Sequence, residues 1–170
     1  MPTEASKSDN ILAVATLLFR AKGYHATSIN EVAEKARIQK ASVYHHFESK
    51  ESLAIAVMAK VQKHFDTSIF SYAYDEALSP EARLMEMNRA LEQFFSGETT
   101  GCVFVNFAIE TIDSIPSFLA PVQGYFTACS HAYRSIFMQV YNAGEANALA
   151  DDFGSDFARG THHDAPHRQH

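Results

Sequence analysis

Side chains that suit contact with a polyanion are concentrated in the first 50 residues. An amide such as that of Gln39 can pair with the edge of adenine in the major groove of DNA. Lysine and tyrosine side chains can reach backbone phosphates, and hydroxyls at a helix N-terminus stand beside free amides that attract the same groups. The candidate nucleic-acid contacts are Thr27, Ser28, Gln39, Lys40, Ser42, Tyr44, His45 and Lys50.

Two short helices joined by a tight turn are predicted to position these side chains. Ser28, followed three residues later by Glu31, has the spacing of a capping box, in which each side chain bonds the backbone amide of the other residue. A break is expected at residues 37–39, and a second short helix over residues 40–47. The polar candidates therefore lie on or beside these two helices.

A small apolar core is expected between the two helices. Ala33, Ile38 and Val43 are spaced so that they can meet and fix the interhelical angle, which leaves the polar residues outside. This arrangement is that of a helix-turn-helix, whose second helix enters the major groove. A plain helical hairpin with a polar face has the same pattern, so the pattern alone leaves both interpretations open.

The charges of the chain are distributed unevenly. Residues 1–65 contain 9 Lys and Arg against 6 Asp and Glu, whereas residues 66–170 contain 5 against 14. A basic front on an acidic body suggests that the front meets a polyanion. Ordinary fluctuation of charge along a chain is the alternative.

The rest of the chain is also predicted to be helical, so the fold class is all-α. Ser49 is expected to cap a helix that runs to about Phe65, and Pro80 to begin one that ends near Phe95. Residues 101–115 suit a buried helix, although their β-branched residues leave a strand possible. A further helix is expected over residues 116–141. Strand alternation with hairpin turns is not found.

Length and composition exclude several classes of protein. The chain has 170 residues, 46% of them hydrophobic and 20% charged, which is typical of a globular protein. No apolar run is long enough to span a membrane, and the N-terminus does not suit a signal peptide. Two cysteines, Cys102 and Cys129, are consistent with a reducing cytoplasm. Without a Gly-rich phosphate loop or a catalytic signature, neither an enzyme nor a bound cofactor is expected.

Several spaced segments together resemble the N-terminal domain of TetR-family transcriptional regulators. These segments are Gly23-Tyr24-His25-Ala26-Thr27-Ser28-Ile29, Val32-Ala33, Ser42-Val43-Tyr44-His45-His46-Phe47 and Ser49-Lys50-Glu51-Ser52-Leu53. The resemblance covers about residues 8–65 and implies a three-helix DNA-binding head on a helical body that binds ligand and dimerises. It also implies that residues 39–45 are the recognition helix and that Thr27, Tyr44 and Lys50 contact phosphates.

Three positions depart from the pattern of the family. Arg37 occupies a turn position usually filled by Gly, and in a left-handed backbone it would cost about 1 kcal/mol relative to Gly. Gln39 replaces the usual Ser at the cap of the recognition helix, and Ala41 replaces a common Gly within it. These departures concern the individual base contacts rather than the motif.

The resemblance implies two domains and a tail. A helix-turn-helix DNA-binding domain is expected over residues 1–50 and a ligand-binding and dimerisation domain over residues 51–150, with the helix over residues 51–65 connecting them. Residues 151–170 lack helical periodicity and are expected to be a disordered or truncated tail.

The body contains one group of candidate ligand contacts. Gly101-Cys102, followed by Asn106 and Glu110, resembles a sequence from one branch of the family's ligand-binding domain, and Asn106 and Glu110 share a helix face. An ordinary hydrophobic core with outward polar groups is the alternative for these residues. The candidate ligand contacts are Cys102, Asn106, Phe107, Glu110, Phe126 and His131.

The leading functional hypothesis is a ligand-responsive repressor that binds a palindromic DNA operator as a homodimer in the cytoplasm. A small apolar or aromatic molecule is expected to release it, and no membrane partner is expected. One alternative is a truncated regulator with impaired dimerisation. Another class is a metal-binding protein that uses His162, His163, His167 and His170, although no metal site is assigned to the rest of the chain.

Overall fold

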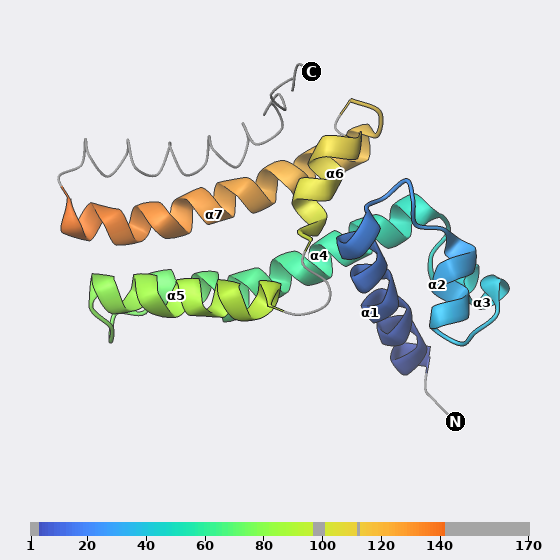
Figure 1. Ribbon diagram of the computed structural model, residues 1–170, viewed down its shortest axis with the longest axis horizontal. Coiled ribbons are helices and arrows are strands. Elements are labelled where there is room, and N and C mark those ends of the chain that lie inside the picture. Colours follow the sequence, from blue (N-terminus) through green and yellow to red (C-terminus); the bar gives the residue numbers. More distant parts are fainter. Residues whose placement is uncertain (1–3, 97–100, 112, 142–170) are drawn as a thin grey trace, which may run out of the picture.

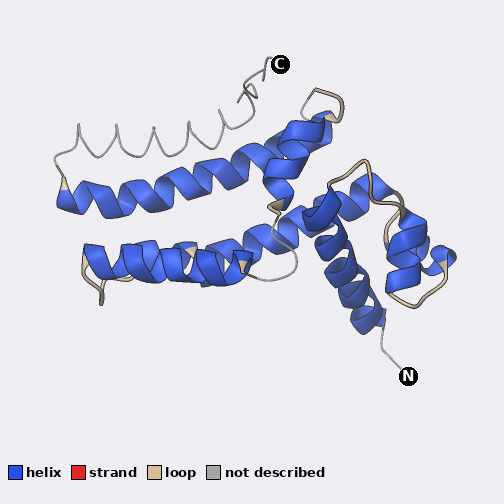
Figure 2. Cartoon of the chain, viewed as in Figure 1, coloured by secondary structure: helices blue, strands red, loops and turns tan. Residues whose placement is uncertain are grey.

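The computed structural model describes residues 4–96, 101–111 and 113–141, and all the regular elements in these ranges are helical (Figures 1 and 2). The prediction of an all-α fold is confirmed. None of the described helices combines the length and apolar composition that a membrane crossing requires. The elements are α1 (Glu4–Lys22), α2 (Ile29–Lys35), α3 (Lys40–His46), α4 (Lys50–Ser68), η1 (Phe70–Tyr74), α5 (Pro80–Phe95), α6 (Val103–Thr111), η2 (Pro116–Phe118) and α7 (Leu119–Val140).

The first three helices and the start of α4 form the head. Helix α1 packs against α2 and α4, and α2 packs against α3 (Figure 1). The head has its own core because each of these helices turns one apolar face inward. Ile11 and Phe19 of α1, Val32 of α2 and Val43 of α3 are all fully buried.

Helix α4 extends from the head into the body (Figure 1). It begins at Ser49, whose Oγ accepts a hydrogen bond from the amide of Ser52 at 3.0 Å, while the Ser52 hydroxyl accepts one from the amide of Ser49. This reciprocal cap satisfies two amides that the first turn of the helix leaves free. Because α4 contacts α1 at one end and α7 and η1 further along, it is part of both the head and the body.

The body consists of the rest of α4 with η1, α5, α6, η2 and α7. Helix α7 packs along α5 and also contacts α4 and α6. Aromatic rings fill the space between these helices. Phe104 of α6 stacks on Tyr125 of α7 at 4.2 Å between ring centroids, and Phe65 of α4 meets Tyr125 edge-on at 5.1 Å.

Several helix limits agree with the sequence predictions, and others differ for local reasons. Ser79 and Pro80 begin α5, which ends at Phe95 as predicted. The apolar segment 101–115 contains a helix, Val103–Thr111, rather than a strand. The helix expected from Pro116 starts as a single 3-10 turn and becomes α-helical only at Leu119. The boundary predicted at residue 150 and the tail over 151–170 lie outside the described residues.

Candidate DNA-binding interface and its contact with the body

The turn between α2 and α3 sets the angle of the candidate recognition helix. The amide of Ile38 donates to the carbonyl of Ala33, and the amide of Arg37 to that of Glu34, both at 3.0 Å. This pair of bonds is a Schellman motif, which places the residue after the helix cap in the left-handed region. Arg37 occupies that position with φ of 56°, so the conformation expected of the family's usual glycine is present with an arginine in its place.

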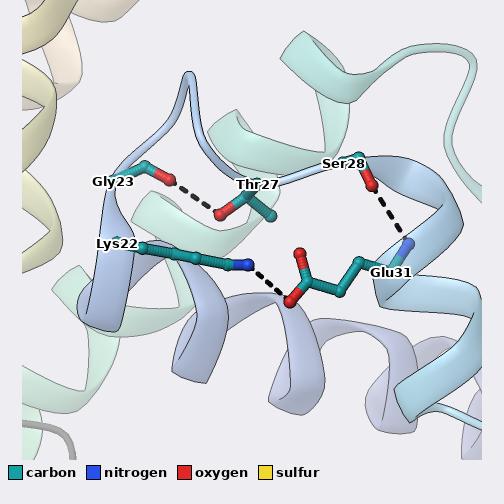
Figure 3. A network of polar contacts seen from close by, with 5 residues as sticks. All are labelled: Lys22, Gly23, Thr27, Ser28 and Glu31. Atoms are coloured by element: carbon teal, nitrogen blue, oxygen red, sulfur yellow. Dashed lines mark hydrogen bonds and ion pairs between the residues drawn. The ribbon is translucent and has the colours of Figure 1, made fainter.

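Two side chains near the N-terminus of α2, Ser28 and Glu31, follow the sequence prediction only in part (Figure 3). Ser28 caps the helix as predicted, because its Oγ accepts a hydrogen bond from the amide of Glu31 at 3.2 Å. The carboxylate of Glu31, however, pairs with Lys22 at the end of α1. The predicted capping box is therefore only half formed, and its acidic side chain links α1 to α2.

Thr27 lies inside the loop that joins α1 to α2. Its side chain is 1% exposed, and its hydroxyl donates to the carbonyl of Gly23 at 2.7 Å (Figure 3). Gly23 has φ of 77°, which favours glycine. In this structure Thr27 supports the loop, and its predicted contact with phosphate stays a prediction.

The outer face of α3 presents most of the other candidate residues to solvent. Gln39 is exposed at the N-cap and makes no capping hydrogen bond with its side chain, so its amide is available. Lys40, Tyr44 and His45 are exposed on the same helix, with the Lys40 ammonium 5.9 Å from the centre of the Tyr44 ring. Ser42 is half-buried between this face and the core. Polar side chains of α3 would therefore make the first contacts with another surface.

Lys50 stands at the first turn of α4, beside the loop that precedes α2. Its ammonium lies 4.3 Å from the centre of the Tyr24 ring and donates to the carbonyl of His25 at 3.4 Å. Partial burial lowers the pKa of Lys50, and the nearby Glu110 carboxylate opposes that shift. The lysine thus occupies the point where the loop, α4 and the body meet.

Two candidate ligand contacts of the body, Asn106 and Glu110, lie against the head. The Asn106 amide donates to the carbonyls of Phe19 at 3.1 Å and Arg20 at 3.0 Å, at the end of α1. Oε2 of Glu110 accepts a hydrogen bond from the amide of His25 at 2.9 Å. Both side chains therefore hold the head to α6, a role that the sequence analysis did not anticipate.

The other four ligand candidates are spread over separate parts of the body. Phe107 is fully buried, edge-on to Phe19 at 5.2 Å, in the contact between head and body. Cys102 lies beside Tyr125, whose neighbour Phe126 is half-buried on α7. His131 is exposed on the same helix. The assignment of the six residues to a ligand site stays a prediction.

An apolar pocket of about 400 Å³ lies between α4 and α7. None of the six candidate ligand residues lines it. Two polar residues of α4, Gln62 and Asp66, are part of its wall, and sequence reasoning missed them. Their spacing of four residues was the one available signal, but only the packing of α7 shows that this face of α4 borders a cavity.

Comparison with known proteins identifies the head. Residues 11–57 match the family of bacterial regulatory proteins described as the tetR family. They form a TetR-family DNA-binding domain. The matched residues include α2, the turn at Arg37 and α3.

A curated relative and two solved structures extend the comparison beyond the head. The transcriptional repressor DhaR of Mycobacterium sp. (strain GP1) is 28% identical over 59% of the chain, which spans half the length of that repressor. A TetR transcriptional regulator from Legionella pneumophila superposes with a TM-score of 0.80 at 22% identity, covering 95% of this chain and 86% of that one.

The second solved structure is AibR in complex with isovaleryl coenzyme A and operator DNA. It superposes with a TM-score of 0.68 at 22% identity, covering 96% of this chain and 90% of that one. At these identities the two structures show the fold alone, a TetR-type head followed by a helical body. The family and these relatives are transcriptional regulators and not enzymes, in agreement with the sequence analysis.

The two cysteines behind the TetR-family head lie in apolar surroundings. Burial raises the pKa of Cys129 to about 11 and also raises the pKa of Cys102. A thiol with a raised pKa is protonated near neutral pH and reacts slowly, because the thiolate is the nucleophile. The surroundings of both cysteines favour a packing role.

Groups of three or more metal-binding side chains are absent from the part of the chain that the structure describes. The four histidines proposed as metal ligands, His162, His163, His167 and His170, lie outside the described residues. The metal-binding alternative therefore rests on residues that the structure does not describe.

Proposed function

We propose that the chain is a sequence-specific DNA-binding transcriptional regulator that responds to a small molecule and acts as a repressor. The observation that carries this proposal is the exposed polar face of α3 on a TetR-family domain. An α-helix presented in this way fits the major groove, where each base pair has a distinct pattern of donors and acceptors. DhaR, the curated relative, is itself a repressor.

The head residues divide into two proposed roles. Gln39 and His45 are assigned to base edges, because they stand at the exposed end and outer face of α3. The phosphate contacts are assigned to Lys40 and Tyr44 on α3 and to Lys50 on α4. Ser28, Thr27 and Ser42 are proposed to support these contacts near the helix N-termini.

A homodimer is proposed to read a palindromic operator in the cytoplasm. Two heads on one face of the duplex contact half-sites about 34 Å apart, or one helical turn. One head alone forms few base contacts, and the second binds with the benefit of a high effective concentration. The affinity for a palindrome is therefore expected to exceed that for a half-site by orders of magnitude.

The effector is proposed to be a small, largely apolar molecule that binds in the body. It lowers DNA affinity if it binds better to the conformation in which the heads do not fit the operator. Asn106 and Glu110 supply the physical connection, because both join α6 to backbone atoms of the head. A shift of α6 would thus move the loop that carries Ser28 and flanks Lys50.

Selection of binding sites from random duplex DNA, at a fixed moderate salt concentration, tests the proposal. Enrichment of a palindrome is the expected result, and enrichment of a single half-site would favour the regulator with impaired dimerisation. Lys40→Ala should reduce binding to the selected duplex about tenfold. The matched control is Lys63→Ala, which removes the same charge from an exposed position on α4. Folded protein that enriches no sequence would overturn the proposal.

A further inference from the structure

The pocket between α4 and α7 has the dimensions of a small-molecule site. Its volume of about 400 Å³ lies within the range of ligand pockets, which are mostly apolar with a few convergent polar groups. Helix α4 contributes one wall, α7 the opposite wall and α6 a single aromatic ring. The lining residues are Ile55, Met58, Ala59, Gln62, Asp66, Phe104, Pro121, Gly124 and Ala128.

Gln62 lines this pocket, and its side-chain amide carries a hydrogen-bond acceptor without a partner among the described residues. Its Nε2 donates to Oδ1 of Asp66 at 2.7 Å. Its Oε1 is buried and has no hydrogen-bond partner among the described residues. A buried acceptor without a partner is unfavourable, and such groups in native proteins call for an explanation. A bound molecule whose hydroxyl displaces the atoms that cover Oε1 and donates to it would remove this cost.

The hydrogen bond to Asp66 fixes the orientation of the Gln62 side-chain amide. Rotating the Gln62 amide by half a turn would break the 2.7 Å bond and bring its carbonyl oxygen against the carboxylate. The acceptor therefore stays turned away from Asp66. The negative charge of Asp66 also disfavours an anionic ligand, and the remaining lining side chains provide no donor for one.

We infer that this pocket binds a small, largely apolar molecule that carries a hydroxyl group and no carboxylate, with the hydroxyl donating to Oε1 of Gln62. The inference deepens the proposed function, since it names the chemistry of the effector and rests on that function for the effect on DNA. Binding itself requires no DNA. The pocket can therefore be tested separately from the head.

Two methionines allow binding to be located by ¹³C-methyl NMR on the full chain. Met58 lines the pocket and is fully buried, whereas Met85 on α5 is 72% exposed and serves as an internal reference. The probes are 4-propylphenol, 4-propylanisole, which lacks the donor, and 4-propylbenzoate, which carries a charge. We expect 4-propylphenol to shift the Met58 signal but not that of Met85, and to bind about tenfold more tightly than the other two.

Substitutions in the pocket separate the hydrogen bond from general apolar binding. Gln62→Leu should weaken the binding of 4-propylphenol about tenfold and leave the affinity for 4-propylanisole unchanged. Asp66→Asn should instead strengthen the binding of 4-propylbenzoate, because it removes the repelling charge. Gly124 lines the pocket with no heavy atom within 4 Å of an added Cβ, so Gly124→Leu should obstruct all three probes, whereas Gly124→Ala serves as its control.

Three results would overturn the inference. The first is a Met58 signal that does not move at millimolar 4-propylphenol. The second is an equal loss of affinity for 4-propylphenol and for 4-propylanisole in the Gln62→Leu variant. The third is 4-propylphenol binding that Gly124→Leu does not weaken.

The DNA measurement distinguishes failure of the pocket from failure of the proposed function. 4-Propylphenol is added to the protein bound to its selected duplex, and DNA affinity is compared with the Met58 shift in the same sample. A shifted Met58 with unchanged DNA affinity supports the assigned pocket chemistry and contradicts the effector role. An unshifted Met58 overturns the pocket assignment whatever the DNA affinity.

Discussion

Oε2 of Glu110 lies 2.9 Å from the backbone nitrogen of His25 and accepts its hydrogen bond, so a carboxylate of the body holds the loop before α2. The approach is so close that a Cβ added to Gly23 would stand 1.5 Å from the same carboxylate. The His25 carbonyl accepts in turn from Lys50. One side chain of α6 is thus linked through a single loop residue to a proposed phosphate contact.

Glu110→Ala is expected to loosen the head and to reduce its response to the body. The substitution leaves the His25 amide without this acceptor and should lower the free energy of unfolding by about 1 kcal/mol. Ligand affinity in the pocket should stay unchanged, because Glu110 does not line it. The effect of bound ligand on DNA affinity should shrink. Urea unfolding and DNA titration with and without ligand measure these quantities.

Glu110→Gln is the matched control for that experiment. Its side-chain oxygen can still accept from His25, while the negative charge near Lys50 is lost. If bound ligand still changes DNA affinity in Glu110→Gln but not in Glu110→Ala, the hydrogen bond to His25 carries the connection between ligand and DNA binding. A full ligand response in Glu110→Ala would contradict the proposed connection between α6 and the head.

Arg37→Gly is expected to stabilise the protein. The backbone of Arg37 has φ of 56°, where a Cβ is unfavourable and glycine is not. Relief of this strain should raise the free energy of unfolding by about 1 kcal/mol, less a small cost from the greater freedom of glycine in the unfolded chain. Thermal and urea unfolding measure the change. Arg37→Ala keeps the Cβ but removes the charge, so an equal gain in that variant would refute the backbone explanation.

Two glycines of the body are expected to respond in opposite ways to alanine. A Cβ at Gly101 would stand 1.9 Å from the carbonyl oxygen of Arg20, so Gly101→Ala should force α1 and the start of α6 apart and cost about 1–3 kcal/mol. Gly124 lies within α7 with open space around an added Cβ. Gly124→Ala should therefore add about 0.5–1 kcal/mol of stability through helix propensity. Similar unfolding curves for the two variants would contradict these assignments.

The contact between α1 and α6 also shows where prediction from sequence ends. Ser49 and Pro80 mark helix starts by local chemistry, so the beginnings of α4 and α5 were predictable. The partners of Asn106 were not, because the carbonyls that it binds lie 86 and 87 residues away. The spacing of four residues predicted that Asn106 and Glu110 share a helix face. It could not indicate whether they face a ligand or the head.

The pocket between α4 and α7 could not be predicted from the sequence, for a related reason. The hydrogen bond from Gln62 to Asp66 follows from a spacing of four residues on one helix. The absence of a partner for Oε1 among the described residues depends on burial, which the packing around α4 determines. Sequence patterns show which residues share a helix face but not which helix covers that face.

Stability is expected to fall at alkaline pH because of Cys129. Burial raises its pKa from the ordinary 9.0 to about 11, so the folded protein keeps the thiol proton while the unfolded chain loses it. This contribution is complete below about pH 9 and is lost as the pH rises toward 11, by at most about 2–3 kcal/mol. Urea unfolding between pH 8 and 10.5 measures the slope. Cys129→Ala should flatten it, and an unchanged slope would show that Cys129 ionises alike in both states.

Substitutions of Tyr44 and Gln39 are expected to separate the two proposed roles on the recognition helix. Tyr44 is 44% exposed on the outer face of α3, and Gln39 is exposed at its N-terminal end. Tyr44→Phe or Tyr44→Ala should lower DNA affinity to a similar extent for all sequences, because the lost hydroxyl contact is to phosphate. Gln39→Ala should mainly relax the preference at one base pair of each half-site, by about 1–3 kcal/mol of discrimination.

Binding of each variant to a panel of single-base variants of the selected operator tests this division. A uniform loss for Tyr44→Ala and a loss confined to one position for Gln39→Ala are expected, at the same salt concentration for every titration. Equal loss of discrimination from both substitutions would contradict the assigned roles. Tyr44 would then be assigned to a base edge rather than to a phosphate.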